Sequence, residues 1–181
     1  MIKQLPSTKF PSLEYTPGES IWIDNLIPDN KIPVYFNVSD KITQDESAIV
    51  RVSHALDHMD ELVNKARAHL RDIIQNTKDP SYKLLHDFFA FHLLEMDDES
   101  VKLMFGMEQL ETLSELEMLD LLMLKSLGSS LGEGWLGSNF EKEQKKQIFI
   151  IDFTFDPEYT DQLIVVYLDA NNNILTISHE S

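Results

Sequence analysis

Serine, histidine and an acid, the residue types that serve nucleophilic catalysis, stand together in the sequence SHES at residues 178–181. The residues before them alternate as a β-strand does, and successive side chains of a strand point to opposite faces. Ser178 and Glu180 would therefore lie away from His179, and none could orient its neighbour as a triad requires. We interpret this stretch as an edge or closing strand.

Two other histidine patterns could support chemistry. His54 and His58 are four residues apart, the spacing that places two imidazoles on one helical face for a shared metal. No HExxH motif or third ligand accompanies them, so we predict no metal and no cofactor and keep a metal-dependent enzyme as an alternative. His92 lies in LLHDFFAFHLLEMD on an apolar helical face, which favours a hydrogen-bonded core histidine over a base or ligand.

A glycine-rich stretch, GSSLGEGWLG, occupies residues 128–137. It lacks the Gly-Lys-Ser/Thr ending of a phosphate-binding loop, contains Glu133 and follows a predicted helix, so phosphate binding is not expected. Trp135 within it is either an exposed binding anchor or a core residue. We include Trp135 among the predicted partner-binding residues.

Acidic residues concentrate between positions 95 and 124, where Lys102 is the only base. Such a run is either a solvated face or a docking surface that steers a basic protein. A second acidic group lies in the sequence DPEYTD at residues 156–161. The predicted partner-binding residues are therefore Asp97, Asp98, Glu99, Trp135, Asp156, Glu158 and Asp161.

The first half of the chain predicts three elements. Residues 1–19 contain three prolines and read as a leader. Ser20–Val38 alternates around the turn residues PDNK and predicts a β-hairpin. Thr43 and Glu46 form a possible capping box, and apolar residues from Ile49 to Ile73 follow at spacings of three and four. That spacing predicts one long helix that buries a single stripe.

The second half predicts helices followed by strands. One helix should run from Asp79-Pro80 to about Met96, and another should follow a capping box of Thr112 and Glu115 and continue through Leu124. Residues 128–137 predict an irregular connection or a short, distorted strand. Alternation from Gln147 to His179 predicts a three-stranded antiparallel meander.

The predicted fold class is therefore α+β. An antiparallel sheet, made from the N-terminal hairpin and the C-terminal meander, would pack against an inserted group of about three helices. Residues 20–181 should form a single domain after the leader.

Composition limits the classes of function. The chain has 181 residues, of which 43% are hydrophobic, and no cysteine, which excludes disulfides, thiolate metal sites and a cysteine nucleophile. No signal peptide is recognisable, and the longest apolar run, Leu163–Leu168, is too short to cross a bilayer. We therefore expect a cytoplasmic protein that does not bind membranes. Thirty-one acids against 15 bases give a net charge of −16, which repels nucleic acid and favours a basic protein partner.

Three stretches together resemble a bacterial family of unknown function proposed to be immunity proteins of polymorphic toxin systems. They are the hairpin SIWIDNLIPDNKIPVYFNV, the helix end FAFHLLEMDDE and the closing IDFTFDPEYTDQLIVVYLDANNNILTISHES. The resemblance spans most of the chain, but not the leader or the stretch GSSLGEGWLG. It implies an α+β domain without established catalysis that binds and blocks a toxin.

Our leading hypothesis is therefore an acidic, non-catalytic binding protein that neutralises a cognate bacterial toxin. Two other classes stay open. One is the metal-dependent enzyme with His54 and His58 as ligands, and the other is a housekeeping scaffold for protein interactions. The sequence does not predict the oligomeric state or identify the toxin.

Overall fold

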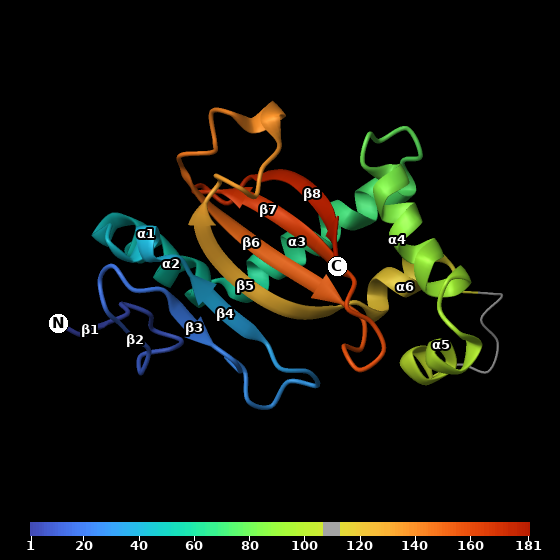
Figure 1. Ribbon diagram of the computed structural model, residues 1–181, viewed down its shortest axis with the longest axis horizontal. Helices are drawn as coiled ribbons and strands as arrows, with labels where there is room; N and C mark the ends of the chain where they lie inside the picture. The colour runs from blue at the N-terminus through green and yellow to red at the C-terminus, as the bar shows by residue number, and fades with distance from the viewer. Residues whose placement is uncertain (107–112) are drawn as a thin grey trace.

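A computed structural model describes residues 1–106 and 113–181 of the protein. In this part of the chain, helices pack against one face of a six-stranded mixed sheet, and Figure 1 looks onto the opposite face, with α3 behind the strands. The fold is thus α+β, as the sequence predicts, although the sheet is mixed rather than antiparallel. The sheet consists of β3 (Ile21–Ile23), β4 (Tyr35–Val38), β5 (Met123–Leu131), β6 (Gln147–Thr154), β7 (Leu163–Asp169) and β8 (Ile174–Glu180).

The strands follow one another across the sheet in chain order. Neighbouring strands are antiparallel except β4 and β5, which are parallel because the helices lie between them in the sequence. The predicted hairpin is β3–β4 and the predicted meander is β6–β7–β8, and both belong to this one sheet. β8 is an edge strand, as expected for the closing residues.

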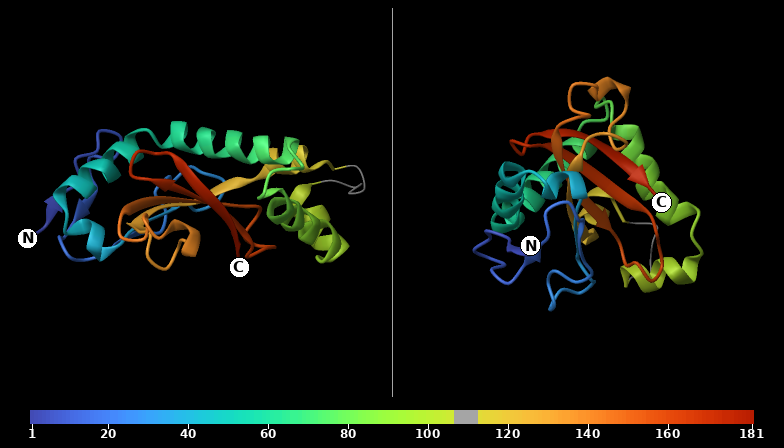
Figure 2. Two further views of the ribbon diagram at one scale, coloured as in Figure 1. Left: turned by 90° about the horizontal axis from the view of Figure 1, so that it is seen from above. Right: turned by 60° about the vertical axis from the view of Figure 1, so that its left-hand side comes forward.

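The α-helices of the described residues lie between β4 and β5 in the sequence, and a short 3-10 helix, η1 (Ser138–Phe140), lies between β5 and β6. The α-helices are α1 (Asp40–Thr43), α2 (Glu46–Asp57), α3 (Met59–Gln75), α4 (Tyr82–Leu94), α5 (Asp98–Phe105) and α6 (Glu115–Leu121). Figure 2 shows α2 and α3 along one side of the sheet and α4 to α6 gathered at one end. The inserted group is therefore larger than the three helices predicted.

The core lies between the sheet and these helices. Alternate residues of β6, among them Phe149, Ile151 and Phe153, are fully buried on the helix side, where they meet buried side chains such as Leu70 and Phe88. Alternation at a period of two is what places these residues on one face. The alternation that predicts the first strand of the meander is therefore confirmed by the burial of these residues.

The predicted long helix is divided in two. The stripe is buried, since residues such as Ile49, Leu56 and Leu70 are almost inaccessible, but α2 ends at Asp57 and α3 begins at Met59. His58 between them has φ −110° and ψ 24°, outside helical geometry. The break lets two shorter helices follow the twisted sheet, and Figure 2 shows α2 inclined to α3.

The predicted capping box of Thr43 and Glu46 is wrong. Asp45 caps α2, because its carboxylate accepts hydrogen bonds from the amides of Ser47 at 2.8 Å and Ala48 at 3.2 Å. The Thr43 hydroxyl instead donates to the Glu19 carbonyl at 2.9 Å.

Residues 122–131 differ most from the sequence prediction. α6 ends at Leu121, Leu122 is extended, and β5 occupies the inside of the sheet between β4 and β6. Leucines at helical spacing continue through Leu124, so the apolar pattern alone does not reveal the end of the helix. The capping box that begins α6 joins Ser114 and Glu117, whereas Thr112 of the predicted box lies outside the described residues.

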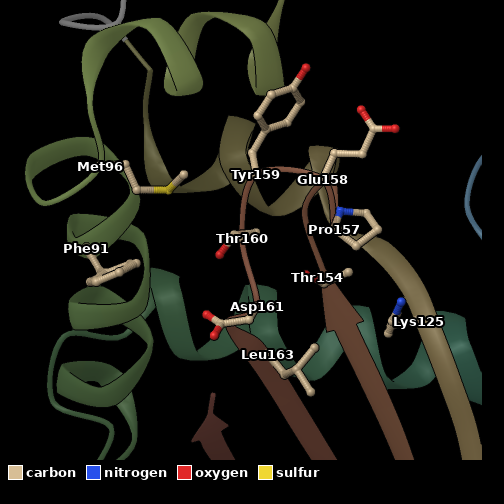
Figure 3. Close-up of a pocket in the computed structure, with 10 residues that line it drawn as sticks. All are labelled: Phe91, Met96, Lys125, Thr154, Pro157, Glu158, Tyr159, Thr160, Asp161 and Leu163. Carbon is tan, nitrogen blue, oxygen red and sulfur yellow. The ribbon is translucent and has the colours of Figure 1, made fainter.

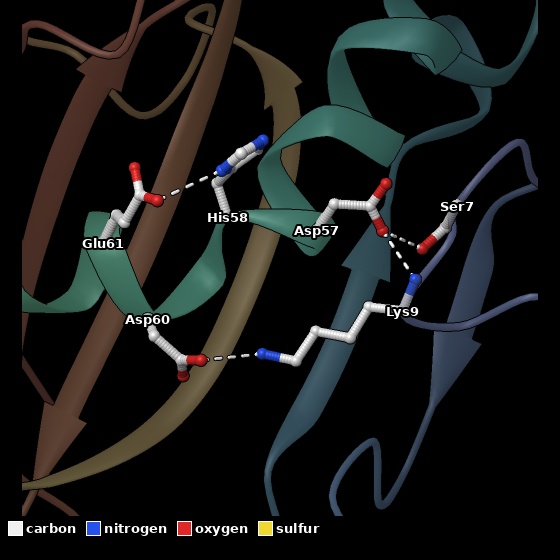
Figure 4. Close-up of polar contacts among 6 residues, drawn as sticks. All are labelled: Ser7, Lys9, Asp57, His58, Asp60 and Glu61. Carbon is white, nitrogen blue, oxygen red and sulfur yellow. Dashed lines mark hydrogen bonds and ion pairs between the residues drawn. The ribbon is translucent and has the colours of Figure 1, made fainter.

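Residues 1–19 pack against α2 and α3. They form a small sheet of β1 (Lys3–Gln4) and β2 (Glu14–Tyr15), and Leu5 and Tyr15 are part of the core. The Asp57 carboxylate, at the end of α2, accepts bonds from the Ser7 hydroxyl at 2.6 Å and the Lys9 amide at 2.9 Å (Figure 4). The segment is therefore held by both apolar and charged contacts.

Candidate functional site

The predicted acidic turn connects β6 to β7 and carries acids at the end of the sheet. The Asp156 carboxylate accepts the Glu158 amide at 3.1 Å and so holds the turn itself. The Asp161 carboxylate accepts a bond from the Gln162 side-chain amide at 2.7 Å. Glu158 is exposed, and its carboxylate accepts no hydrogen bond from the described residues. Of the three acids, Glu158 is thus the freest to meet a partner.

Two histidines fix this turn to the rest of the fold. His92 on α4 donates from Nδ1 to the Phe88 carbonyl at 2.8 Å, so its Nε2 accepts the Thr160 hydroxyl at 3.0 Å. His179 on β8 donates from Nε2 to the Gln162 side-chain oxygen at 2.7 Å. Burial lowers the pKa of His92 to about 4, which keeps it neutral near pH 7. The prediction of His92 as a core histidine is therefore confirmed.

A cavity of about 600 Å³ lies around the turn (Figure 3). Phe91 and Met96 approach it from α4 and the residues after it, while Glu158, Tyr159 and Asp161 belong to the turn. Further lining residues are Lys125, Thr154, Pro157, Thr160 and Leu163. The lining carries two carboxylates, of Glu158 and Asp161, against one ammonium, of Lys125, and the rest is largely apolar, which suits an amphipathic, cationic side chain of a protein partner.

The acids of residues 97–99 follow directly after Met96 in this cavity wall. Asp97 caps α5, because its carboxylate accepts the Ser100 amide at 2.8 Å and the Ser100 hydroxyl at 2.7 Å. These bonds hold the pKa of Asp97 below its usual range. Asp98 and Glu99 are exposed and have no such structural task. Asp97 is therefore primarily a helix cap, and only the other two are free for docking.

Other acids of the predicted acidic run are also engaged within the fold. Asp120 pairs with Arg71, and Glu115 pairs with the His86 imidazole. Glu108 and Glu111 of that run lie outside the described residues. The stretch is therefore not one continuous free acidic face.

Trp135 lies at the opposite end of β6 from the acidic turn. It belongs to the connection between β5 and β6, and 52% of its surface is exposed. The predicted partner-binding residues therefore form two groups, with Trp135 apart from the acids.

A surface that sequence reasoning missed lies on the face of the sheet away from the helices, which we call the helix-free face. Its residues come from six strands: Trp22, Tyr35, Asn37, Ser126, Gly128, Ile148, Ile150, Asp152, Thr154, Leu163, Val165, Tyr167, Thr176, Ser178 and Glu180. The connection at residues 132–146 covers one part, where Leu136 and Phe140 pack on Ile150 and Tyr167. The only sequence signal is the alternation of β6, which turns Asp152 away from the core.

The remaining part of this face is polar and acidic. Ser126 donates its hydroxyl to the Asp152 carboxylate. Ser178 donates to Glu180 at 2.8 Å, so Tyr167, whose hydroxyl lies 3.1 Å from Ser178 Oγ, acts as the donor in that contact. Burial, with a contribution from the Glu180 charge, raises the pKa of Asp152 to about 6.

The closing residues behave as the strand geometry requires. Ser178 and Glu180 lie on the helix-free face, while the His179 ring lies on the other face and meets Phe88 edge-on at 5.3 Å between ring centroids. No triad is formed by these adjacent residues.

The rings of His54 and His58 do lie together, 4.3 Å apart between centroids. His58 Nδ1 is 3.3 Å from Glu61, but within residues 1–106 and 113–181 no cluster of three or more His, Cys, Asp or Glu side chains is arranged to hold a metal. In the same residues, no helix combines the length and apolar character needed to cross a bilayer.

Comparison with protein-family models, curated proteins and solved structures gave no match to this chain. Function is therefore inferred from the charges, cavity and contacts of the protein itself.

Proposed function

We propose that this protein is an acidic, non-catalytic binding protein that neutralises a basic toxin domain by covering its surface. The observation that supports the proposal is the acidic cavity at the end of the sheet, where Glu158 and Asp161 stand beside Phe91 and Met96. Asp98 and Glu99 extend the negative charge of this end. Apolar contact area with a charged rim is the usual composition of a protein interface.

The charge of the whole chain acts in the same direction. A net charge of −16 attracts a basic partner and accelerates encounter, while contacts within the cavity would determine how long the complex lasts. A basic substrate groove, such as that of a nuclease toxin, would be complementary to this surface. The resemblance to proposed immunity proteins points to the same class of partner.

Co-expression with the open reading frames next to the gene tests the proposal. We expect one of them to be toxic alone, to be tolerated in the presence of this protein and to co-purify with it. The complex should form more slowly at high salt, because exposed charges act mainly on association. No rescue, together with equimolar metal in the purified protein, would instead favour the enzyme with His54 and His58.

Matched variants locate the surface. Glu158→Lys with Glu99→Lys reverses two exposed charges near the cavity without removing the Asp97 cap, and we expect it to lower the association rate by about tenfold. Glu14→Lys with Glu61→Lys makes the same change in charge on residues 1–19 and α3. If the two double variants lower the association rate equally, overall charge rather than this end of the molecule guides the partner.

A further inference from the structure

The part of the helix-free face that we call open consists of the exposed Trp22 and Glu180 and the half-buried Tyr35, Asp152 and Ser178, with buried residues such as Ser126 and Val165 between them. Trp22 is 66% exposed and lies 6.0 Å from the Tyr35 ring, between centroids, on the neighbouring strand. Asp152 lies on β6, and Glu180 on β8 is exposed. Large exposed aromatic side chains beside polar groups are typical of protein contact surfaces.

The acids of this face have no cation of their own. None of the ion pairs within the described part of the chain includes Asp152 or Glu180. Ser126 offers Asp152 a neutral hydroxyl only, and the Glu180 charge opposes ionisation of Asp152. Holding a half-buried carboxylate without a cation destabilises the free protein, and a partner that supplied the cation would remove that cost.

The same face already accommodates one cation on an aromatic ring. The Lys125 ammonium lies 4.6 Å from the centre of the Tyr35 ring. Lys125 also lines the cavity at the acidic turn, as do Thr154 and Leu163, so the open face continues into that cavity. A partner seated in the cavity would therefore extend naturally over this face.

We propose that the open part of the helix-free face docks an arginine-bearing segment of the partner protein that crosses the strands, with a guanidinium between Asp152 and Glu180 and a further contact on Trp22 at the opposite edge of the sheet. Arginine suits this place because its planar group pairs with carboxylates and stacks on aromatic rings. The inference rests on the proposed function for the identity of the partner, but the surface itself can be tested separately. It also assigns different tasks to the two groups of acids, since the exposed acids around the cavity guide encounter and this pair holds the complex.

A synthetic peptide of alternating arginine and valine is the probe, and the same peptide with neutral citrulline in place of arginine is its control. Nuclear magnetic resonance titration at physiological salt should show the largest shifts at the amides of β6 to β8 and around Trp22 on β3, and the citrulline peptide should cause none. Asp152→Asn combined with Glu180→Gln should weaken binding of the arginine peptide by about tenfold or more. Asp98→Asn combined with Glu99→Gln removes the same charge elsewhere and should weaken it by less than about threefold.

Aromatic variants give an independent readout. Trp22→Ala should weaken the peptide by about fivefold, whereas Trp135→Ala, which removes the other exposed tryptophan, should leave its affinity unchanged. Equal losses in the two pairs of acid variants, or amide shifts confined to α5 and the acidic turn, would overturn the proposal. A melting temperature no lower than that of wild type excludes misfolding of a variant as the cause of a loss.

The two proposals fail in different ways. If a co-expressed toxin is neutralised equally well by the Asp152→Asn, Glu180→Gln variant, the docking surface is wrong and the proposed function stands. If the arginine peptide binds the helix-free face as described and no neighbouring gene product is toxic or bound, the surface stands and the neutralising function is wrong.

Discussion

Asp152 shows at the level of one residue how stability and binding can oppose each other. Its carboxylate lies on the helix-free face, and burial raises its pKa to about 6. An acid whose folded pKa exceeds its unfolded value, about 3.9, loses stabilisation as pH rises from about 4 to about 6. At neutral pH the ionised Asp152 carboxylate therefore destabilises the folded, unbound protein to the full extent.

Asp152→Asn should raise the free energy of unfolding at pH 7 by about 2 kcal/mol, because each unit of pKa shift corresponds to about 1.4 kcal/mol. The gain should nearly vanish at about pH 4, where the native carboxyl is protonated. Urea denaturation at the two pH values measures the difference. Asp98→Asn, on an exposed residue, is the control and should change stability by less than about 0.5 kcal/mol.

The pKa of Asp57 is shifted in the opposite direction to that of Asp152. Burial opposes its ionisation, but bonds from the Ser7 hydroxyl and from the Lys9 and Thr8 amides outweigh this and hold the pKa of the carboxyl well below its usual range. An acid with a lowered folded pKa contributes stability above the unfolded value of about 3.9 and loses it as pH falls towards the folded pKa.

Asp57→Ala should therefore cost about 1–2 kcal/mol at pH 7, allowing for screening by solvent, and progressively less below about pH 4. It should also speed proteolysis within residues 1–19, which the carboxylate holds against α2. Asp60→Ala removes only the exposed ion pair to Lys9 and should cost less than about 0.5 kcal/mol. Equal effects of the two variants would contradict the role of Asp57 in anchoring this segment.

At the level of elements, β5 was the main failure of sequence reasoning. The hairpin β3–β4 and the meander β6–β8 could be predicted because their alternation and turn residues agree. β5 contains the sequence KSLGSS, with small polar residues instead of β-branched ones, and it follows leucines that still fit a helical spacing. Only its neighbours β4 and β6, which supply hydrogen bonds on both sides, make it a strand.

The site could be predicted in part for a related reason. The acidic turn and its charges are local in sequence, so they were visible. The helix-free face depends on strand register, which places Trp22, Ser126, Asp152 and Glu180 on the same face of the sheet although they are far apart in the chain. The charge of Asp97 predicts a partner-binding residue, but in the structure its carboxylate caps α5.

Close approach of β4 and β5 gives a test of this central pairing. A Cβ at Gly128 would lie 2.7 Å from the Asn37 side-chain oxygen and 3.3 Å from the Asn37 carbonyl oxygen. Gly128→Ala should therefore destabilise the protein by about 1–3 kcal/mol, and adding Asn37→Ala should recover part of that loss in a double-mutant cycle. Gly137→Ala, where no atom lies within 4 Å, is the control. Additive losses at positions 37 and 128 would show that the two side chains do not compete for space.

His92 links α4 to the acidic turn through its bonds to Phe88 and Thr160. Protonation of His92 should therefore weaken the contact between these two elements. Its folded pKa, about 4, lies below the unfolded value of about 6.5, so its neutral form supports folding above about pH 6.5 and this support is lost as pH falls towards 4. His92→Gln should lower stability at about pH 7.5 but should remove about 2–3 kcal/mol of the loss that wild type suffers on going to about pH 4.5. Parallel pH profiles of the two proteins, measured by urea denaturation, would contradict this assignment.

For the whole molecule, the net charge of −16 has a consequence that needs no partner. Like charges repel more strongly in the compact state than in the expanded unfolded chain, and salt screens that repulsion within about 10 Å at 0.1 M. Raising sodium chloride from about 0.01 M to about 0.2 M should therefore increase the melting temperature by about 2–4 °C, which corresponds to roughly 1 kcal/mol for a chain of this size. Calorimetry measures the shift.

A bound basic peptide should also raise the melting temperature at low ionic strength, because its positive charges reduce the repulsion among the acids of the protein. The arginine peptide should therefore raise the melting temperature in about 0.01 M salt and have a smaller effect in about 0.2 M salt. The Asp152→Asn, Glu180→Gln variant should begin with a higher melting temperature and gain less from the peptide, since the substitutions have already removed the unpaired charges of the helix-free face. If its gain equals that of wild type, the peptide stabilises through diffuse charge alone, and the acids of this face do not act as a specific pair.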